Sequence, residues 1–212
     1  MTLGKHWAIG LAGMGMALAA QADTLYTQGF DNLGTSGWVS TNMSAPVGQA
    51  WFQGNAGIFD AQAGATGSYA AANFLSAVGS GSIDNWLISP SLTLGSAMTL
   101  SFWARSASDS GFADAFKVYF SAGSDGSVGS FTSVLASITA TTNGWTQYSF
   151  ALPDAASGRI AFEYLVANAD NANYMGIDSV SITSAVPEPT TYALMGLGLA
   201  GIALLRRRRQ GD

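Results

Sequence analysis

Carboxylates are the main side chains that could do chemistry in the central part of this 212-residue chain. The chain contains no cysteine, and its single histidine, His6, lies beside an N-terminal apolar segment. Ser–His–Asp and Cys–His nucleophile arrangements and the usual zinc sites are therefore excluded from residues 23–186. A two-carboxylate glycosidase is the remaining enzymatic alternative. Because Glu163 is the only glutamate in this range and no acid pair is indicated, we expect a protein without catalytic residues.

Asp178 is the most informative of these carboxylates. In the last predicted strand it shares parity with Val180 and Ile182, which should face the core. A carboxylate on that face is costly to bury unless it is paired or bound to a metal. Ca²⁺ would satisfy it, because this ion takes oxygen ligands from carboxylates and backbone carbonyls. The alternatives are backbone N–H donors or an ion pair with Arg105 or Arg159.

Aromatic side chains are the second group that could bind a ligand, by stacking on sugar rings. Most are expected to pack in the core or between sheets. Trp103 and Tyr119 are the better candidates for glycan stacking, because their neighbours at ±1 should take the inward face.

The elements that position these residues are predicted to be strands. Apolar residues recur at period 2, which is typical of half-buried strands, in the runs 98–104, 116–121, 146–152 and 160–166. The first half is less regular, with candidate strands at 24–30, 50–53, 57–61 and 68–76. Turn-forming residues separate the runs, and no helical period is sustained between residues 23 and 186. The pattern predicts an all-β sandwich.

The charge of this central part limits its partners. Residues 23–186 carry three basic and eleven acidic side chains, a net charge of −8, against −5 for the whole chain. Binding to nucleic acid is not expected, because phosphates require lysine and arginine. Divalent cations and neutral glycans are compatible with the charge.

The C-terminal segment has three successive parts. Pro187, Glu188 and Pro189 favour an extended peptide, because proline fixes its own φ and restrains the preceding residue. The uncharged run 192–205 would be a helix of about 21 Å, short against a hydrocarbon core of roughly 30 Å. Four arginines then favour a cytoplasmic end: Arg206, Arg207, Arg208 and Arg209. A short transmembrane helix is expected; the alternative is a buried core helix with a basic end.

This order of Pro-Glu-Pro, apolar run and arginine cluster resembles the PEP-CTERM sorting signal. The resemblance implies recognition by an exosortase, a membrane cysteine peptidase or transpeptidase of Gram-negative bacteria that make exopolysaccharide. Residues 185–212 are then a sorting and anchor segment, whose helix holds the protein in the inner membrane until it is processed.

The N-terminal segment has the layout of a secretory signal peptide. Lys5 and His6 precede the apolar run 7–19, and Ala20-Gln21-Ala22 matches a cleavage site for signal peptidase. We expect residues 1–22 to be removed on export; a retained N-terminal anchor is the alternative.

The body, residues 23–184, resembles the choice-of-anchor J or cleaved-adhesin family. The most specific matches are DNWLISP at residues 84–90 and GIDSVSI at residues 176–182. The resemblance implies a jelly-roll sandwich related in shape to MAM domains and carbohydrate-binding modules. It also implies a structural Ca²⁺ shared by the first and last strands, with Asp31 as the partner of Asp178. Ser179 stands where many relatives carry a second aspartate, which weakens a site that needs adjacent carboxylates.

These features together predict an exported protein of the cell surface or the exopolysaccharide matrix of a biofilm. Its sandwich would be structural or adhesive. A carbohydrate-binding module for the secreted polysaccharide is the first alternative, and a glycosidase is the second.

Overall fold

The computed structural model describes residues 22–185 and 196–202. Residues Ala22–Ala185 form one compact unit. In the C-terminal segment, residues 196–202 are helical, inside the predicted run 192–205. No helix among the described residues is both long enough and apolar enough to cross a membrane. The predicted signal peptide, the Pro-Glu-Pro stretch and the four arginines lie outside the described residues.

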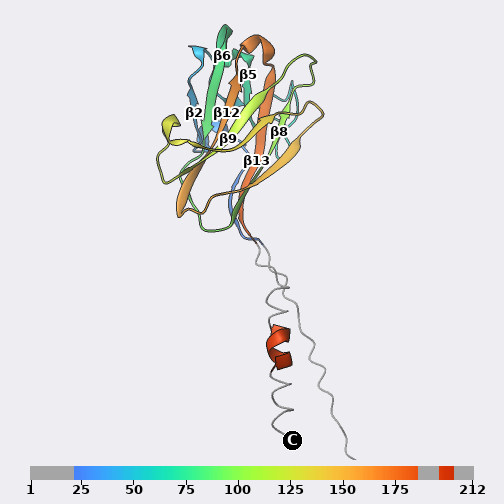
Figure 1. Ribbon diagram of the computed structural model, residues 1–212. Helices are drawn as coiled ribbons and strands as arrows, with labels where there is room; N and C mark the ends of the chain where they lie inside the picture. The colour runs from blue at the N-terminus through green and yellow to red at the C-terminus, as the bar shows by residue number, and fades with distance from the viewer. Residues whose placement is uncertain (1–21, 186–195, 203–212) are drawn as a thin grey trace, which may run out of the picture. The chain divides into compact units, whose positions relative to one another are not determined.

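The body is a sandwich of two mainly antiparallel sheets (Figure 1). Sheet A has the order β11-β8-β13-β5-β4, with β1 also paired to β13. Its strands are β1 (Thr24–Gln28), β4 (Phe52–Gln53), β5 (Ala70–Asn73), β8 (Met98–Ser106), β11 (Thr146–Ala151) and β13 (Tyr174–Ser184). Sheet B has the order β10-β9-β12-β6-β2, with β3 on β6 and β7 on β12. Its strands are β2 (Val39–Asn42), β3 (Ala45–Val47), β6 (Ala77–Ile88), β7 (Leu92–Thr93), β9 (Ala115–Ala122), β10 (Ser133–Thr139) and β12 (Ser157–Val166).

The core lies between the sheets and follows the predicted alternation. Along β8, every second residue from Met98 to Ser106 is buried and the intervening ones are partly exposed. Phe102 from sheet A meets Phe162 from sheet B edge to face, with ring centroids 4.8 Å apart. Both rings are fully buried. Such burial is the main source of stability in a body that has no disulfide. The prediction of an all-β sandwich is confirmed.

The first half, where the alternation in the sequence is less regular, is built mainly from short strands, turns and loops. Single 3₁₀ turns occur here at η1 (Leu33–Thr35) and η2 (Phe74–Ser76), and in the second half at η3 (Val128–Ser130) and η4 (Ala169–Asn171). The predicted strand at 57–61 is wrong, because this stretch belongs to a loop between β4 and β5. Its backbone bonds within the loop and to a side chain instead of to a neighbouring strand. The Ala61 N–H donates to the Thr66 carbonyl oxygen, and the Phe59 carbonyl oxygen lies 3.0 Å from the Tyr69 hydroxyl. We call residues 54–68 the covering loop.

A bulge in the last strand also changes the predicted parity of Asp178. Ile177 pairs with Ala104, but the register with β8 shifts between Asp178 and Ser181. Ser179 adopts a positive φ of 49° at this point. Asp178 therefore lies on the outer side of sheet A, opposite Trp103, and the expectation that it faces the core with Val180 is wrong. It is nevertheless fully buried, because the covering loop lies on it.

Candidate functional site

The outer side of sheet A carries an indole ring beside a row of serine hydroxyl groups. Trp103, in the middle of β8, is half-buried on the side opposite to Phe102. Gln147 of β11 pairs with it across the sheet and is exposed. One step along, Ser149, Ser101 and Ser181 stand in register across β11, β8 and β13. The Oγ atoms of Ser101 and Ser181 lie 2.8 Å apart. We call the surface formed by Trp103, Gln147, Ser149, Ser101 and Ser181 the Trp103 face.

The covering loop borders the Trp103 face and is fixed by aromatic packing. Phe59 stacks on Tyr69 at 5.0 Å and meets Trp145 edge to face at 5.5 Å. The Trp145 indole N–H donates to the carbonyl oxygen of Asp60 over 2.9 Å. Gly176 lies beneath this packing, where an added Cβ would come within 2.8 Å of the Tyr69 ring. The border of the face is therefore held in one position by the sheet below it.

Asp178 and Asp31 both hold the covering loop. The Asp178 carboxylate accepts the backbone N–H groups of Gln62 at 2.8 Å and Ala63 at 3.1 Å. Asp31 accepts the Ser68 hydroxyl at 2.8 Å. Burial raises the pKa of the Asp178 carboxyl to about 6, although its N–H donors act in the opposite direction. The predicted backbone N–H alternative thus describes the contacts that Asp178 makes.

The predicted calcium site rests on these two carboxylates. Among residues 22–185 and 196–202, no group of three or more His, Cys, Asp or Glu side chains is placed to hold a metal ion. A Ca²⁺ ion takes six to eight oxygen ligands, so Asp31 and Asp178 would need several backbone carbonyls beside them. Both carboxylates contact the same loop, which can supply such carbonyls. The site fits this chemistry in part and stays a prediction.

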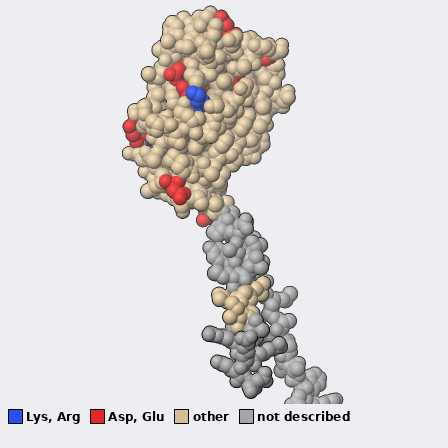
Figure 2. All heavy atoms as spheres, viewed as in Figure 1, with Lys and Arg blue, Asp and Glu red and all other residues tan. Residues whose placement is uncertain are grey.

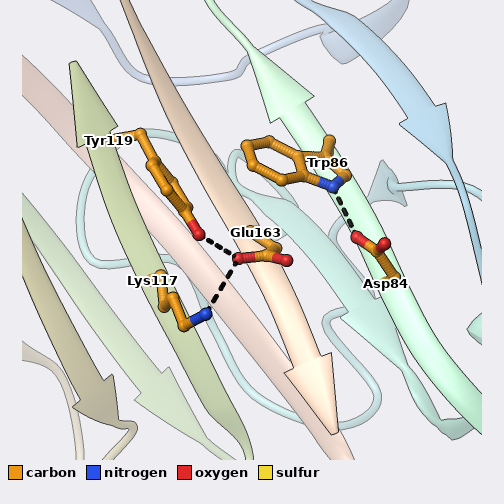
Figure 3. Close-up of polar contacts among 5 residues, drawn as sticks. All are labelled: Asp84, Trp86, Lys117, Tyr119 and Glu163. Carbon is orange, nitrogen blue, oxygen red and sulfur yellow. Dashed lines mark hydrogen bonds and ion pairs between the residues drawn. The ribbon is translucent and has the colours of Figure 1, made fainter. Parts of the chain in front are cut away.

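Tyr119, the second predicted stacking residue, lies on the outer side of sheet B, where neighbouring side chains surround it (Figure 3). Its ring is 7% exposed and packs against Trp86, with centroids 4.8 Å apart. Its hydroxyl donates to Glu163 over 2.6 Å. Burial and this hydrogen bond raise the pKa of Tyr119 well above its ordinary value. Of the two predicted residues, Trp103 is the one that keeps part of its ring accessible.

The same outer side of sheet B contains an acid pair that the sequence analysis missed. Asp84 and Glu163 are brought together by the pairing of β6 with β12 (Figure 3). Burial raises the pKa of Glu163, and the Asp84 carboxylate adds to this rise. Glu163 also accepts from Tyr119 and forms an ion pair with Lys117 at 3.7 Å. A glycosidase needs two carboxyl groups facing the scissile bond, whereas Glu163 is 6% exposed and contacts Tyr119 and Lys117, and Asp84 accepts the indole N–H of Trp86. The period-2 pattern places both on one face of sheet B, but strand pairing was needed to find them.

A surface groove lies where sheet A and sheet B part, between η1, β2 and β4. Its volume is about 500 Å³. The indole N–H groups of two lining residues already have partners: Trp38 donates to the Tyr26 hydroxyl and Trp51 to the carbonyl oxygen of Asn85. Both rings are less than 10% exposed. The groove therefore exposes the edge of the core more than it offers a stacking surface.

The C-terminal segment matches a known family model. Residues 185–209 fit the model described as the PEP-CTERM protein-sorting motif. The chain carries a PEP-CTERM sorting signal. This signal marks an exported protein that passes the membrane, is processed by exosortase and is sorted to the surface. The resemblance stated from Pro187, Glu188, Pro189 and the four arginines is confirmed.

The sandwich in front of the PEP-CTERM signal matches solved adhesin domains in fold. The K1 cleaved adhesin domain of Lys-gingipain from Porphyromonas gingivalis is 24% identical over 76% of this chain and 98% of its own, with a TM-score of 0.63. The K3 domain of the same protein is 21% identical over 78% and 100%, also with a TM-score of 0.63. The CBM22-2 xylan-binding domain from Paenibacillus barcinonensis is 12% identical over 76% and 99%, with a TM-score of 0.50. No curated protein matches the chain. At these identities the likeness establishes the jelly-roll fold of the PEP-CTERM protein and leaves its ligand to be argued from the site.

Proposed function

We propose that this chain is an exosortase substrate that displays a structural or adhesive sandwich without catalytic activity on a Gram-negative bacterium. Its destination is the cell surface or the exopolysaccharide matrix. The observation that carries the proposal is a PEP-CTERM signal at residues 185–209, following a body with the fold of cleaved adhesin domains. The absence of cysteine and of any histidine other than His6 supports a role without covalent or zinc chemistry.

Processing of the C-terminal segment tests this proposal. We expect intact-mass spectrometry of the exported protein to show loss of the arginine-bearing tail in cells that contain exosortase. Replacement of Pro187, Glu188 and Pro189 by alanine should leave the tail attached, as should deletion of the exosortase. The matched control replaces Thr190 and Thr191 by alanine and should be processed normally. An identical C-terminal mass in all four samples would contradict the proposal.

A second candidate function is binding of the secreted polysaccharide. The Trp103 face supports it. Its partly exposed indole can pack against the apolar C–H groups of a sugar ring, and the neighbouring hydroxyl and amide groups can bond to the sugar hydroxyls. A xylan-binding domain with the same fold shows that such a sandwich can carry a sugar site. Retardation of the protein in gels that contain polysaccharide separates this function from a purely structural one.

A structural calcium ion at Asp31 and Asp178 is part of the proposal. Asp178 is buried and no lysine or arginine among the described residues pairs with it, so a cation would relieve the cost that raises its pKa. We expect removal of calcium with EGTA to lower the melting midpoint by roughly 5–10 °C, since a ligand at 100 times its Kd stabilises by about 2.7 kcal/mol. Asp31→Asn should abolish this shift, and Asp60→Asn, an exposed change in the covering loop, should preserve it. An unchanged midpoint in the original protein would count against the site.

A further inference from the structure

Arg105 differs from the other basic residues of the body in having no polar partner. Lys117 pairs with Glu163, and Arg159 donates to two backbone carbonyls. Within residues 22–185, Arg105 donates no side-chain hydrogen bond, and its Nε is buried without a partner. In a body that carries so few cations (Figure 2), a guanidinium without a hydrogen-bond acceptor among the described residues is unusual.

The guanidinium of Arg105 is held in place by aromatic rings. Its central carbon lies 4.1 Å from the centroid of the Phe59 ring and 6.0 Å from that of Trp145. Rings in this position attract a cation through their quadrupole and limit its motion. Only Nε is both buried and unpartnered, so the two terminal nitrogens are the part of the group that remains accessible. Those two nitrogens form the planar fork that binds a carboxylate through two parallel hydrogen bonds.

Arg105 lies directly beside the Trp103 face. The two residues are separated by one position on β8 and are on the same side of the sheet, which places them about 7 Å apart along the strand. The nearby Asp178 is fully buried and its carboxylate is occupied by the covering loop. A ligand on the indole of Trp103 therefore meets a positive group at this end of the face.

We propose that the Trp103 face and Arg105 together bind a carboxylated sugar unit, a uronic acid within a polysaccharide. The ring stacks on Trp103, the hydroxyls bond to the serine row, and the carboxylate bonds to the guanidinium of Arg105. An acidic peptide fits less well, because β8 lies between β11 and β13 and has no free backbone edge for an added strand. This inference rests on the proposed glycan-binding function and specifies its ligand class.

The decisive comparison uses one sugar backbone with and without its charge. We expect the full-length chain in mild detergent to bind a tetrasaccharide of galacturonic acid at least about tenfold more tightly than its methyl ester, as charged hydrogen bonds allow. Arg105→Gln should remove this preference, and Arg105→Lys should keep part of it, because lysine retains the charge but not the fork. Lys117→Gln, the same change of charge on sheet B, should leave the preference intact.

The outcomes separate this inference from the function on which it rests. Equal affinity of the original protein for the acid and the ester would overturn the role of Arg105 while leaving glycan binding in place. This comparison needs no variant, so it holds even if Arg105→Gln fails to fold. Lack of binding to the acid, to the ester and to every neutral polysaccharide would overturn the glycan-binding function itself. If Lys117→Gln lost the preference for the acid as fully as Arg105→Gln, the preference would depend on net charge alone. That result would also overturn the inference.

Discussion

Replacing Asp114 with alanine is expected to destabilise the body by about 3–5 kcal/mol, because several hydrogen-bond donors would lose a buried acceptor. Asp114 is 1% exposed. Its carboxylate accepts the Ser106 hydroxyl, the Tyr164 hydroxyl at 2.5 Å and the backbone N–H of Asn173 at 2.8 Å. Without it, the Tyr164 hydroxyl and the Asn173 N–H lose this acceptor, and the Ser106 hydroxyl keeps only the Tyr174 carbonyl oxygen at 3.3 Å. Buried unpaired donors each cost about 1–3 kcal/mol. Urea unfolding followed by tryptophan fluorescence measures the change.

Asp109→Ala is the matched control for this prediction. Asp109 belongs to the same connection between β8 and β9 and also binds Asn173, through the side-chain amide at 2.7 Å, but at an exposed position. We expect its replacement to change the free energy of unfolding by less than about 1 kcal/mol, as exposed polar contacts do. Similar losses for both variants would show that the connection, and not the buried carboxylate, holds the two sheets together.

The role of Asp114 was hidden in the sequence. It lies in the connection between β8 and β9, where an aspartate is usually a solvated turn residue. Asp114 is instead buried, and its partners Tyr164 and Asn173 are 50 and 59 residues away along the chain. Local composition predicts a turn but contains no information about which distant strands will close over it.

The positions of the strands could be predicted more completely than the side-chain contacts between them. Alternation at period 2 fixed the inward residues of β8, β9 and β12 correctly, because each of these strands has one face in the core. The same rule failed at Asp178, where the bulge at Ser179 shifts the register. The residue types around a bulge do not reveal it, so counting alternate positions back from Val180 could not detect it.

The candidate site shows the same division between pattern and topology. The outward position of Trp103 followed from its neighbours in β8, and its half-buried ring agrees with it. Tyr119 had the same pattern, yet Trp86 from β6 covers its ring. Arg105 could not be singled out, because the rings of Phe59 and Trp145 that hold it come from a loop and a distant turn.

Replacing Trp103 with alanine is expected to lower the affinity for polysaccharide by about 10- to 100-fold, which corresponds to 1.4–2.8 kcal/mol. An aromatic anchor commonly accounts for this share of a binding energy. The remaining groups of the Trp103 face, Gln147 and the serine row, offer hydrogen bonds that water also supplies, so they cannot replace the lost contact. Affinity electrophoresis against a panel of acidic and neutral polysaccharides measures the effect.

Tyr119→Phe is the matched control on sheet B for this prediction. This variant removes the hydroxyl that donates to Glu163 and leaves the aromatic ring in place on sheet B. Affinity should then stay unchanged if sugars bind on sheet A, whereas Trp103→Ala should lose it while retaining its melting transition. Because Trp103 is only half-buried, its removal leaves the core between the sheets intact, and a loss of affinity in a folded protein reports on contact with the sugar. Full affinity in Trp103→Ala, or an equal loss in Tyr119→Phe, would move the binding surface away from the Trp103 face.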